Sequence, residues 1–275
     1  MTMEIQLLKV ALIAYLVGAG GFAHYLLRWR ESSRAIAMAA LIAAFVMHGI
    51  SIVARSFAGG HVAVTTEYEA LSYFAWLGVG VYLGAQLRYR LPAVGAVVAS
   101  LAFVATLVVF ALTTGVRELP PNLQSAWLPV HVTLAFLGNA VLALAFSVSL
   151  VYLLHERLLK ERRVGGLLTR LPSLESLDRL NYQALVYGFP LLTLGILTGA
   201  LWSNMSWGRF WSWEEREVFS LVTWLLYAGL LQARLVVGWR GRRAARLTII
   251  GFAVVLISFM FGHVFFPGKH HGSFD

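Results

Sequence analysis

Long apolar stretches alternate with short polar stretches along the whole chain. Eight apolar stretches can be distinguished, at residues 4–27, 35–54, 68–87, 91–114, 127–154, 181–203, 217–239 and 245–267. A helix needs about 20 apolar residues to cross a hydrocarbon layer about 30 Å thick. Each stretch is about that long or longer, so the pattern predicts eight transmembrane helices. The predicted fold class is all-α, a polytopic membrane helix bundle.

Composition supports lipid as the main solvent of this chain. Hydrophobic residues make up 59% of the sequence and charged residues only 13%, whereas soluble domains carry about 25% charged residues. The first stretch lacks the basic leading region and the small-residue cleavage pattern of a signal peptide. No polar segment between the stretches is long enough to hold a second fold. We therefore expect one integral membrane domain over residues 1–275.

The net charge of +9 raises the question of nucleic-acid binding, and the placement of the charges argues against it. Alternate loops hold 16 of the 22 Lys and Arg residues: Arg28, Arg30, Arg34, Arg88, Arg90, Arg157, Lys160, Arg162, Arg163, Arg170, Arg179, Arg234, Arg240, Arg242, Arg243 and Arg246. Loops enriched in basic residues stay in the cytoplasm. The pattern therefore predicts a cell-membrane protein with the lipid bilayer as its partner. Both termini are expected outside, together with the tryptophan-rich loop that holds Trp207, Trp211 and Trp213.

Two further features limit the chemistry. The chain has no cysteine, so it cannot carry a disulfide, a thiol relay, an iron–sulfur cluster or a C-x-x-C-H haem attachment site. The largest predicted inner loop, residues 156–180, ends in LPSLESLDRL. The leucine spacing there is compatible with a segment that lies flat on the membrane surface.

Four of the nine tryptophans lie within twelve residues, between the sixth and seventh stretches. They are Trp202, Trp207, Trp211 and Trp213. Tryptophan is common at membrane interfaces, where it anchors helix ends. For Trp202 that interpretation and a binding role are equally plausible. The density of Trp207, Trp211 and Trp213 favours a second interpretation, in which indole rings form the walls of a site for a flat apolar ligand.

Histidine supplies the candidate metal ligands. Of the eight histidines, His131, His270 and His271 are expected on the same side as the tryptophan loop. Imidazole binds iron well as a neutral nitrogen donor. His131 and either His270 or His271 could clamp a haem iron from both faces, and Arg209 or Arg216 could pair with a propionate.

His48 is a separate case because it is predicted to lie deep in the membrane. It follows Arg34 by fourteen residues, which corresponds to about 21 Å of helix. An ionisable group at that depth is a functional candidate. A neutral imidazole that is hydrogen-bonded to a neighbouring helix explains the position equally well, and the sequence leaves both interpretations open.

The tryptophan loop also carries a family resemblance. Trp207-Gly-x-x-Trp211-x-Trp213, followed by Glu217 and by LLQARLVVGWRGRRAA, resembles the haem-handling "WWD" motif of the cytochrome c assembly family. Within that family the chain is similar to the CcsA-type proteins of the two-component (System II) cytochrome c maturation pathway. The resemblance extends over most of residues 45–272 and is most specific in the tryptophan loop.

The resemblance implies a function. It implies that the chain binds haem b as cargo and presents it at the outer face to apocytochrome c, together with a membrane partner of the ResB/CcsB type. By motif matching, His131 and His270 would be the axial ligands. Glu214 stands where the motif has Asp, and Gln232 stands where the family has a histidine. The chain would be at most one component of a holocytochrome c synthase.

Two other functions remain open at this stage. One is a HemX-type regulator or scaffold of haem biosynthesis, which the loss of the histidine at Gln232 fits. The other is a small-molecule or proton-coupled transporter, suggested by His48 at depth. Transporters often have helices broken by Gly or Pro at the midplane, and Gly188-Phe189-Pro190 and Gly195 in the sixth stretch are the only strong hint of one.

Overall fold

The computed structural model describes residues 3–112, 124–161 and 166–265, with the side chains of residues 169 and 258–265 left out of the description. All regular structure within these residues is helical. The elements are α1 (Met3–Arg28), α2 (Glu31–Gly59), α3 (Glu67–Arg88), α4 (Pro92–Ala111), α5 (Trp127–Lys160), the short 3-10 helix η2 (Leu168–Arg170), α6 (Leu174–Trp207), α7 (Glu215–Leu235) and α8 (Arg242–Phe265).

The all-helical fold and the multi-pass membrane character predicted from the sequence are confirmed. Each of the eight apolar stretches coincides with one of the helices α1 to α8. Seven of them, α1 to α7, are long and apolar enough to cross a membrane, within the residues that could be searched. The crossing by α8 and the side on which the termini lie stay predictions.

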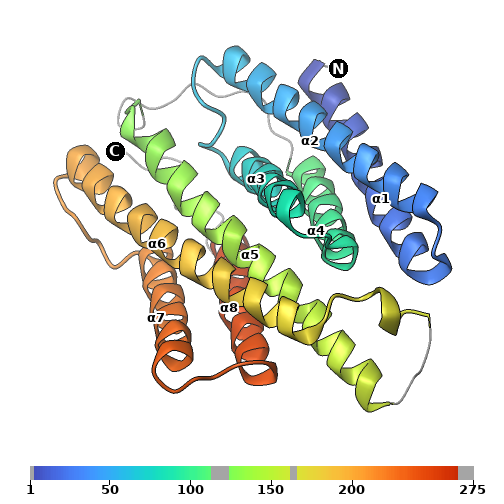
Figure 1. Ribbon diagram of the computed structural model, residues 1–275. Coiled ribbons are helices and arrows are strands. Elements are labelled where there is room, and N and C mark those ends of the chain that lie inside the picture. The colour runs from blue at the N-terminus through green and yellow to red at the C-terminus, as the bar shows by residue number, and fades with distance from the viewer. Residues whose placement is uncertain (1–2, 113–123, 162–165, 266–275) are drawn as a thin grey trace.

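Helix α5 is the central element of the bundle. It packs along α6 and also contacts α3, α4 and α8, while α1 pairs with α2 and with α4 (Figure 1). Two hydrophobic clusters result. One lies among α1 to α5 and the start of α6, and includes Tyr15, Phe22 and Tyr82. The other lies among α5 to α8 and includes Tyr227 and Phe252. The central helix therefore links both clusters.

The contact between α5 and α6 is a direct backbone contact. A Cβ atom added at Gly138 would lie 2.6 Å from the backbone nitrogen of Leu192. A Cβ added at Gly195 would lie 2.6 Å from the Cα of Ala135. Small residues allow this approach, which is a common way of packing helices in lipid. Helix α6 continues without interruption through Pro190, so the expected break at this proline is absent.

The segment expected to lie flat on the membrane instead forms the start of α6. Ser173 caps the helix by accepting a hydrogen bond from the backbone of Ser176, and Leu177 is fully buried at 1% exposure. Asp178 accepts a hydrogen bond of 2.9 Å from Arg234 of α7, and Asn181 accepts another from the same guanidinium. These buried contacts orient the segment inward, so the surface interpretation is wrong for residues 174–180.

A buried charge cluster joins the first three helices. Arg55 of α2 donates from Nε to Glu69 of α3 at 2.8 Å and from its guanidinium to Glu4 of α1 at 3.3 Å. The Arg55 guanidinium also lies over the ring of Tyr68, at 4.4 Å from its centroid. All four residues are buried. Buried charges are tolerated when they are paired in this way, and breaking the pair is costly.

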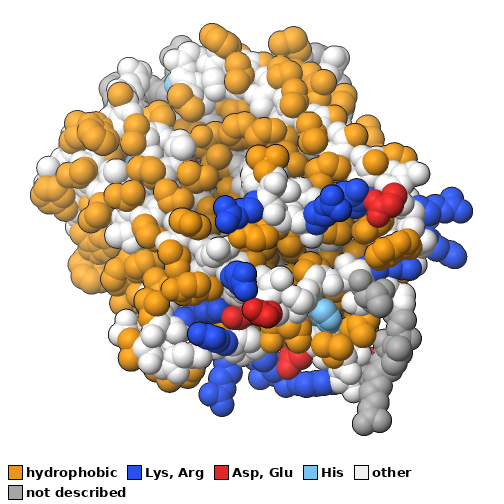
Figure 2. Space-filling model, in the orientation of Figure 1, with side chains coloured by type: hydrophobic (Ala, Val, Ile, Leu, Met, Phe, Trp, Pro, Cys, Tyr) orange, Lys and Arg blue, Asp and Glu red, His pale blue; other side chains and the backbone are white. Residues whose placement is uncertain are grey.

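The connections between helices lie at two opposite ends of the bundle. The turns that join α1 to α2, α5 to α6 and α7 to α8 lie toward the lower and right-hand side of Figure 1. On the face drawn in Figure 2, hydrophobic side chains cover most of the area, and the basic side chains gather in the same lower and right-hand part. The start of α5 and the end of α6 lie at the opposite end, at the upper left of Figure 1.

We expect Gly138→Ala to lower the free energy of unfolding by about 1–3 kcal/mol, because the new methyl group overpacks the contact with α6. Gly78→Ala is the matched control, since a Cβ at Gly78 has no neighbour within 4 Å. That change is expected to be neutral or to stabilise the helix by up to about 1 kcal/mol. Unfolding in detergent micelles measures both variants, and equal effects would contradict the close-contact interpretation.

We expect Arg55→Met to destabilise the protein by about 3–5 kcal/mol, because it leaves the carboxylates of Glu4 and Glu69 buried without their cation. Arg34→Met removes the more exposed ion pair with Glu31, whose side chains are 34% and 60% exposed, and is expected to have a much smaller effect. The same unfolding measurement applies. A loss no larger in Arg55→Met than in Arg34→Met would show that the cluster does not hold α1 to α3 together.

Candidate functional site

His131 lies near the start of α5, against the backbone of α6. Its Nδ1 atom is 2.8 Å from the backbone carbonyl oxygen of Gly195. A carbonyl oxygen only accepts hydrogen bonds, so Nδ1 must carry the proton. In the neutral imidazole the other nitrogen, Nε2, then has a free lone pair. This arrangement, with one ring nitrogen donating to a carbonyl, is typical of histidines that bind a metal through the other nitrogen.

Glycine at two positions of α6 makes room for the His131 ring. Gly195 provides the carbonyl oxygen and lies against Ala135 of α5. A Cβ added at Gly199 would lie 2.5 Å from the Cε1 atom of His131 and 2.8 Å from its Nδ1. The imidazole therefore occupies the space that a side chain at position 199 would fill.

The Trp202 indole lies parallel to the imidazole and is offset from it. The two ring centroids are 6.3 Å apart and the planes are nearly parallel, at 7°. Trp207 packs edge-on against Trp202, with 4.7 Å between centroids and 73° between planes. His131, Trp202 and Trp207 therefore form one continuous aromatic group, which joins the start of α5 to the end of α6.

The tryptophan loop has a defined backbone. Gly208 ends α6 in the left-handed conformation, at φ 70°, and the Ser203 hydroxyl donates to the carbonyl of Arg209 at 2.8 Å. The backbone N–H of Ser212 donates to the Glu217 carboxylate at 2.6 Å. Trp213 has a positive φ of 59°, which a bulky residue rarely adopts. The contacts on either side of Trp213 therefore hold a strained backbone.

This strained turn places Trp213 at the surface. Its side chain is 72% exposed, and it packs edge-on against Trp211, with 5.9 Å between centroids and 84° between planes. Trp207 is also exposed, at 45%. Large aromatic side chains that are held in place and still exposed indicate a binding surface or contact with lipid.

Two indole N–H groups in this region lack a hydrogen-bond partner. The Nε1 atoms of Trp202 and Trp211 are buried and have no acceptor among the described residues. A buried donor without a partner is uncommon and calls for an explanation. Both would be satisfied by an acceptor oxygen of a bound molecule.

The charged residues proposed from the sequence lie at the rim of the loop. Arg209 is exposed and follows directly after the glycine that ends α6. Glu214 is also exposed and is the residue before α7, where its side chain makes no capping hydrogen bond. Either side chain is free to turn toward a ligand held by the tryptophans.

The structure favours the structural interpretation of His48. The side chain is fully buried, at 0% exposure, on α2. Its Nδ1 is 3.0 Å from the Tyr15 hydroxyl of α1, and its Nε2 is 2.8 Å from the Ser72 hydroxyl of α3. Both ring nitrogens are thus occupied, and the imidazole joins three helices. His48 does not lie in the group formed by His131 and the tryptophans.

The other sequence candidates divide as follows. His270 and His271 lie outside the described residues, so their place relative to His131 stays a prediction. Gln232, which stands where the resemblance expects a histidine, is exposed on α7. Trp202 is the residue that sequence analysis left undecided. Its spacing from Gly195 and Gly199, at i, i+4 and i+7 of one helix face, was the available signal.

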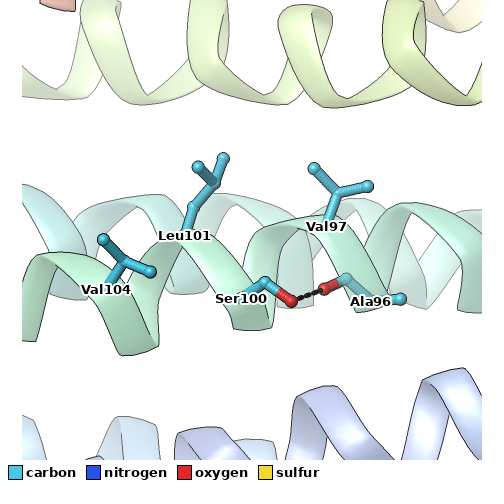
Figure 3. Close-up of a pocket in the computed structure, with 5 residues that line it drawn as sticks. All are labelled: Ala96, Val97, Ser100, Leu101 and Val104. Atoms are coloured by element: carbon cyan, nitrogen blue, oxygen red, sulfur yellow. Dashed lines mark hydrogen bonds between the residues drawn. The ribbon is translucent and has the colours of Figure 1, made fainter.

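Two hollows open on the described surface. One, of about 350 Å³, is lined by α4 alone, and its single polar side chain, Ser100, donates to the carbonyl of Ala96 (Figure 3). Because Leu101 and Val104 there are exposed and apolar, this groove is suited to lipid chains. The other, of about 550 Å³, lies between residues 59–65 and 124–129. It borders the turn of α5 that precedes His131.

Comparison with known proteins gives a consistent result. A model of the protein family described as "Cytochrome C assembly protein" matches residues 8–270. "Cytochrome c biogenesis protein CcsA" of Porphyra purpurea is 32% identical over 274 residues, which cover 85% of this chain and 86% of the relative. The protein of the same name from Parasynechococcus marenigrum is 32% identical over 248 residues, with 80% of each chain covered.

A solved structure shares the fold. It is "Cytochrome c Heme Lyase CcmF", with a TM-score of 0.73 and 18% sequence identity. The match covers 94% of this chain and 47% of that one. This chain therefore spans about half the length of that protein, and the likeness concerns the fold alone.

We expect Glu217→Gln to loosen the tryptophan loop, because it weakens the charge-assisted hydrogen bond to the Ser212 backbone. Glu214→Gln is the matched control, because the Glu214 side chain makes no capping hydrogen bond. Hydrogen exchange of residues 208–214 should become faster in Glu217→Gln and stay unchanged in the control. Unchanged exchange in both variants would show that this contact does not order the loop.

Proposed function

The chain belongs to the cytochrome c assembly protein family, and from this premise we propose that it acts in cytochrome c maturation by holding haem b for transfer to apocytochrome c. Haem is the cargo of the protein in this proposal. It would lie at the outer face of the cell membrane, between an imidazole of α5 and the tryptophan loop.

The proposal rests on the tautomer of His131, in which Nδ1 carries the proton. Its Nδ1–H donates a hydrogen bond to the Gly195 carbonyl. The lone pair that can bind a metal is then on Nε2. That is the form of histidine that binds iron. The imidazole lies beside an aromatic cluster that includes Trp202 and Trp207. A nitrogen ligand next to exposed indole rings is what a flat, apolar, iron-containing molecule requires.

The remaining residues would contact the apolar faces of the porphyrin and its propionate groups. Trp207, Trp211 and Trp213 would wall its apolar faces, which fits their partial exposure. Arg209 would pair with a propionate, and the unpartnered indole N–H groups of Trp202 and Trp211 are further donors for carboxylate oxygens. Glu214, in the acid position of the motif, would set the charge at the rim.

The second axial ligand is proposed to be His270, with His271 as the alternative. Two histidines on opposite faces would occupy both axial positions of the iron and so limit the access of oxygen. The chain's part in the chemistry is then to orient haem and to exclude competing ligands.

In the covalent step, haem and apocytochrome c would supply the groups that react. Each thiol of apocytochrome c adds across a vinyl group of haem, so that a C–S bond forms and the thiol hydrogen passes to the other vinyl carbon. This chain contains no cysteine and so contributes no thiol of its own. A membrane partner of the ResB/CcsB type is proposed to complete the site.

A HemX-type regulator of haem biosynthesis is the second candidate, and one observation favours it. The amide of Gln232 binds iron poorly, and it stands on an exposed part of α7 where a haem-transferring relative would have a histidine. The transporter alternative loses its support, because both ring nitrogens of His48 are bonded within the bundle and α6 is continuous through Pro190.

We expect His131→Ala to abolish the spectrum of histidine-ligated haem in the purified protein and to stop cytochrome c maturation in cells that depend on it. His61→Ala is the matched control: His61 comes from the loop after α2 at the same end of the bundle, and among the described residues its Nδ1 bonds to the neighbouring carbonyl of Val62. The control should keep both the Soret band and maturation.

Absence of a histidine-ligated spectrum in the wild type, with haem supplied, would contradict the proposal. A His-ligated spectrum together with normal cytochrome c maturation after deletion of the protein would favour the regulator instead.

A further inference from the structure

His131 can serve as an iron ligand only if its ring is held in one orientation. The bond from Cβ to an imidazole ring is a torsion with broad, shallow preferences. The lone pair of Nε2 lies in the plane of the ring, so each rotation of the ring redirects it. A ligand at the edge of a helix bundle therefore needs neighbours that fix the ring plane as well as its position.

Three features of α6 contact the ring. The Gly195 carbonyl accepts the Nδ1 proton at one edge, and the backbone at Gly199 lies against the Cε1 side. Trp202 lies parallel to the ring, at 7°. The hydrogen bond alone permits the ring to tilt about its axis, whereas a parallel indole opposes that tilt.

We propose that Trp202 is a positioning residue, whose indole plane fixes the orientation of the His131 imidazole and thereby the direction of its free Nε2 lone pair. The inference rests on the proposed function and deepens it, since Trp202 acts on iron through His131 and not by direct ligation. It also assigns a role to the one tryptophan of the cluster that the sequence left undecided.

Trp202 is itself well placed for this role. The Trp207 ring packs against it in a T-shaped arrangement, with 4.7 Å between centroids, and the next residue, Ser203, is fixed by its hydrogen bond to the Arg209 carbonyl. Its Nε1 has no partner among the described residues, so packing of the ring face, not a hydrogen bond within the protein, holds it in place.

The proposed positioning role therefore requires a flat ring at position 202. Phenylalanine keeps a flat ring at this position, whereas leucine does not. The variants Trp202→Phe and Trp202→Leu thus separate stacking from simple bulk.

The control is Trp224→Leu. Trp224 of α7 also packs against α6, where it contacts Phe189 at 5.3 Å between centroids and donates to the Thr193 hydroxyl. It has no ring contact with His131 among the described residues. A general loss of packing against α6 would appear in this variant as well.

The first readout does not involve haem. Nitrogen-15 spectra of the histidine rings in the haem-free protein report which nitrogen carries the proton, and His131→Asn identifies the signals of His131. We expect the Nδ1-protonated form in the wild type, in Trp202→Phe and in Trp224→Leu. In Trp202→Leu the Gly195 carbonyl still accepts from Nδ1, but the ring can tilt, so the His131 signals should broaden and shift relative to the wild type.

The second readout is haem binding. Loss of a residue that orients a metal ligand typically lowers metal affinity by about 10–100-fold, and we expect a loss of that size in Trp202→Leu with a changed low-spin signal in electron paramagnetic resonance. Trp202→Phe should retain most of the affinity, and Trp224→Leu all of it.

The outcomes separate this inference from the function on which it rests. If the wild type binds no haem, the proposed function fails. If it binds haem while Trp202→Leu keeps both the wild-type His131 ring signals and the affinity, the positioning role is wrong. It is equally wrong if Trp202→Phe is as impaired as Trp202→Leu, or if Trp224→Leu shows the same losses.

Discussion

The direct backbone contact between α5 and α6 is the constraint on which the site depends. In lipid, helices gain little from burying apolar surface against one another, so close packing and interhelical hydrogen bonds must hold them together. Gly138 and Gly195 remove the side chains that would keep the two backbones apart. Only at this short separation does a carbonyl of α6 come within 2.8 Å of the His131 ring. The packing of the two helices thus determines that Nδ1 of the neutral imidazole carries the proton.

Buried polar contacts stabilise the rest of the bundle around this pair. His48 joins α1, α2 and α3 through Tyr15 and Ser72, and the Arg55 cluster joins the same helices nearer their ends. At the other end of the molecule, Arg234 of α7 bonds to Asp178 and Asn181 of α6. A polar side chain in hydrocarbon needs a partner within the protein. Each of these contacts therefore specifies which helices must be neighbours.

The sequence predicted the helices well and the site only in part. Apolar runs identify membrane-spanning helices because the bilayer sets their length, and each predicted stretch is a helix. The start of α6, before residue 181, was missed because Asp178 looks like a surface residue until its partner Arg234 is known. His131 was found from its position and from the family motif. Its contact with Gly195, 64 positions away, could not be read from the sequence, because it depends on how two helices are packed. The same holds for Trp202, for which the sequence left an interface anchor and a binding role both open.

The central claim is that Nε2 of His131 binds the iron of haem while Nδ1 stays bonded to the Gly195 carbonyl. A structure of the haem-loaded protein tests it most directly. The account predicts iron bonded to Nε2 of His131, with the porphyrin against the indole rings of the loop between α6 and α7. Haem bound elsewhere on the protein, or iron on Nδ1 with the bond to Gly195 broken, would contradict it.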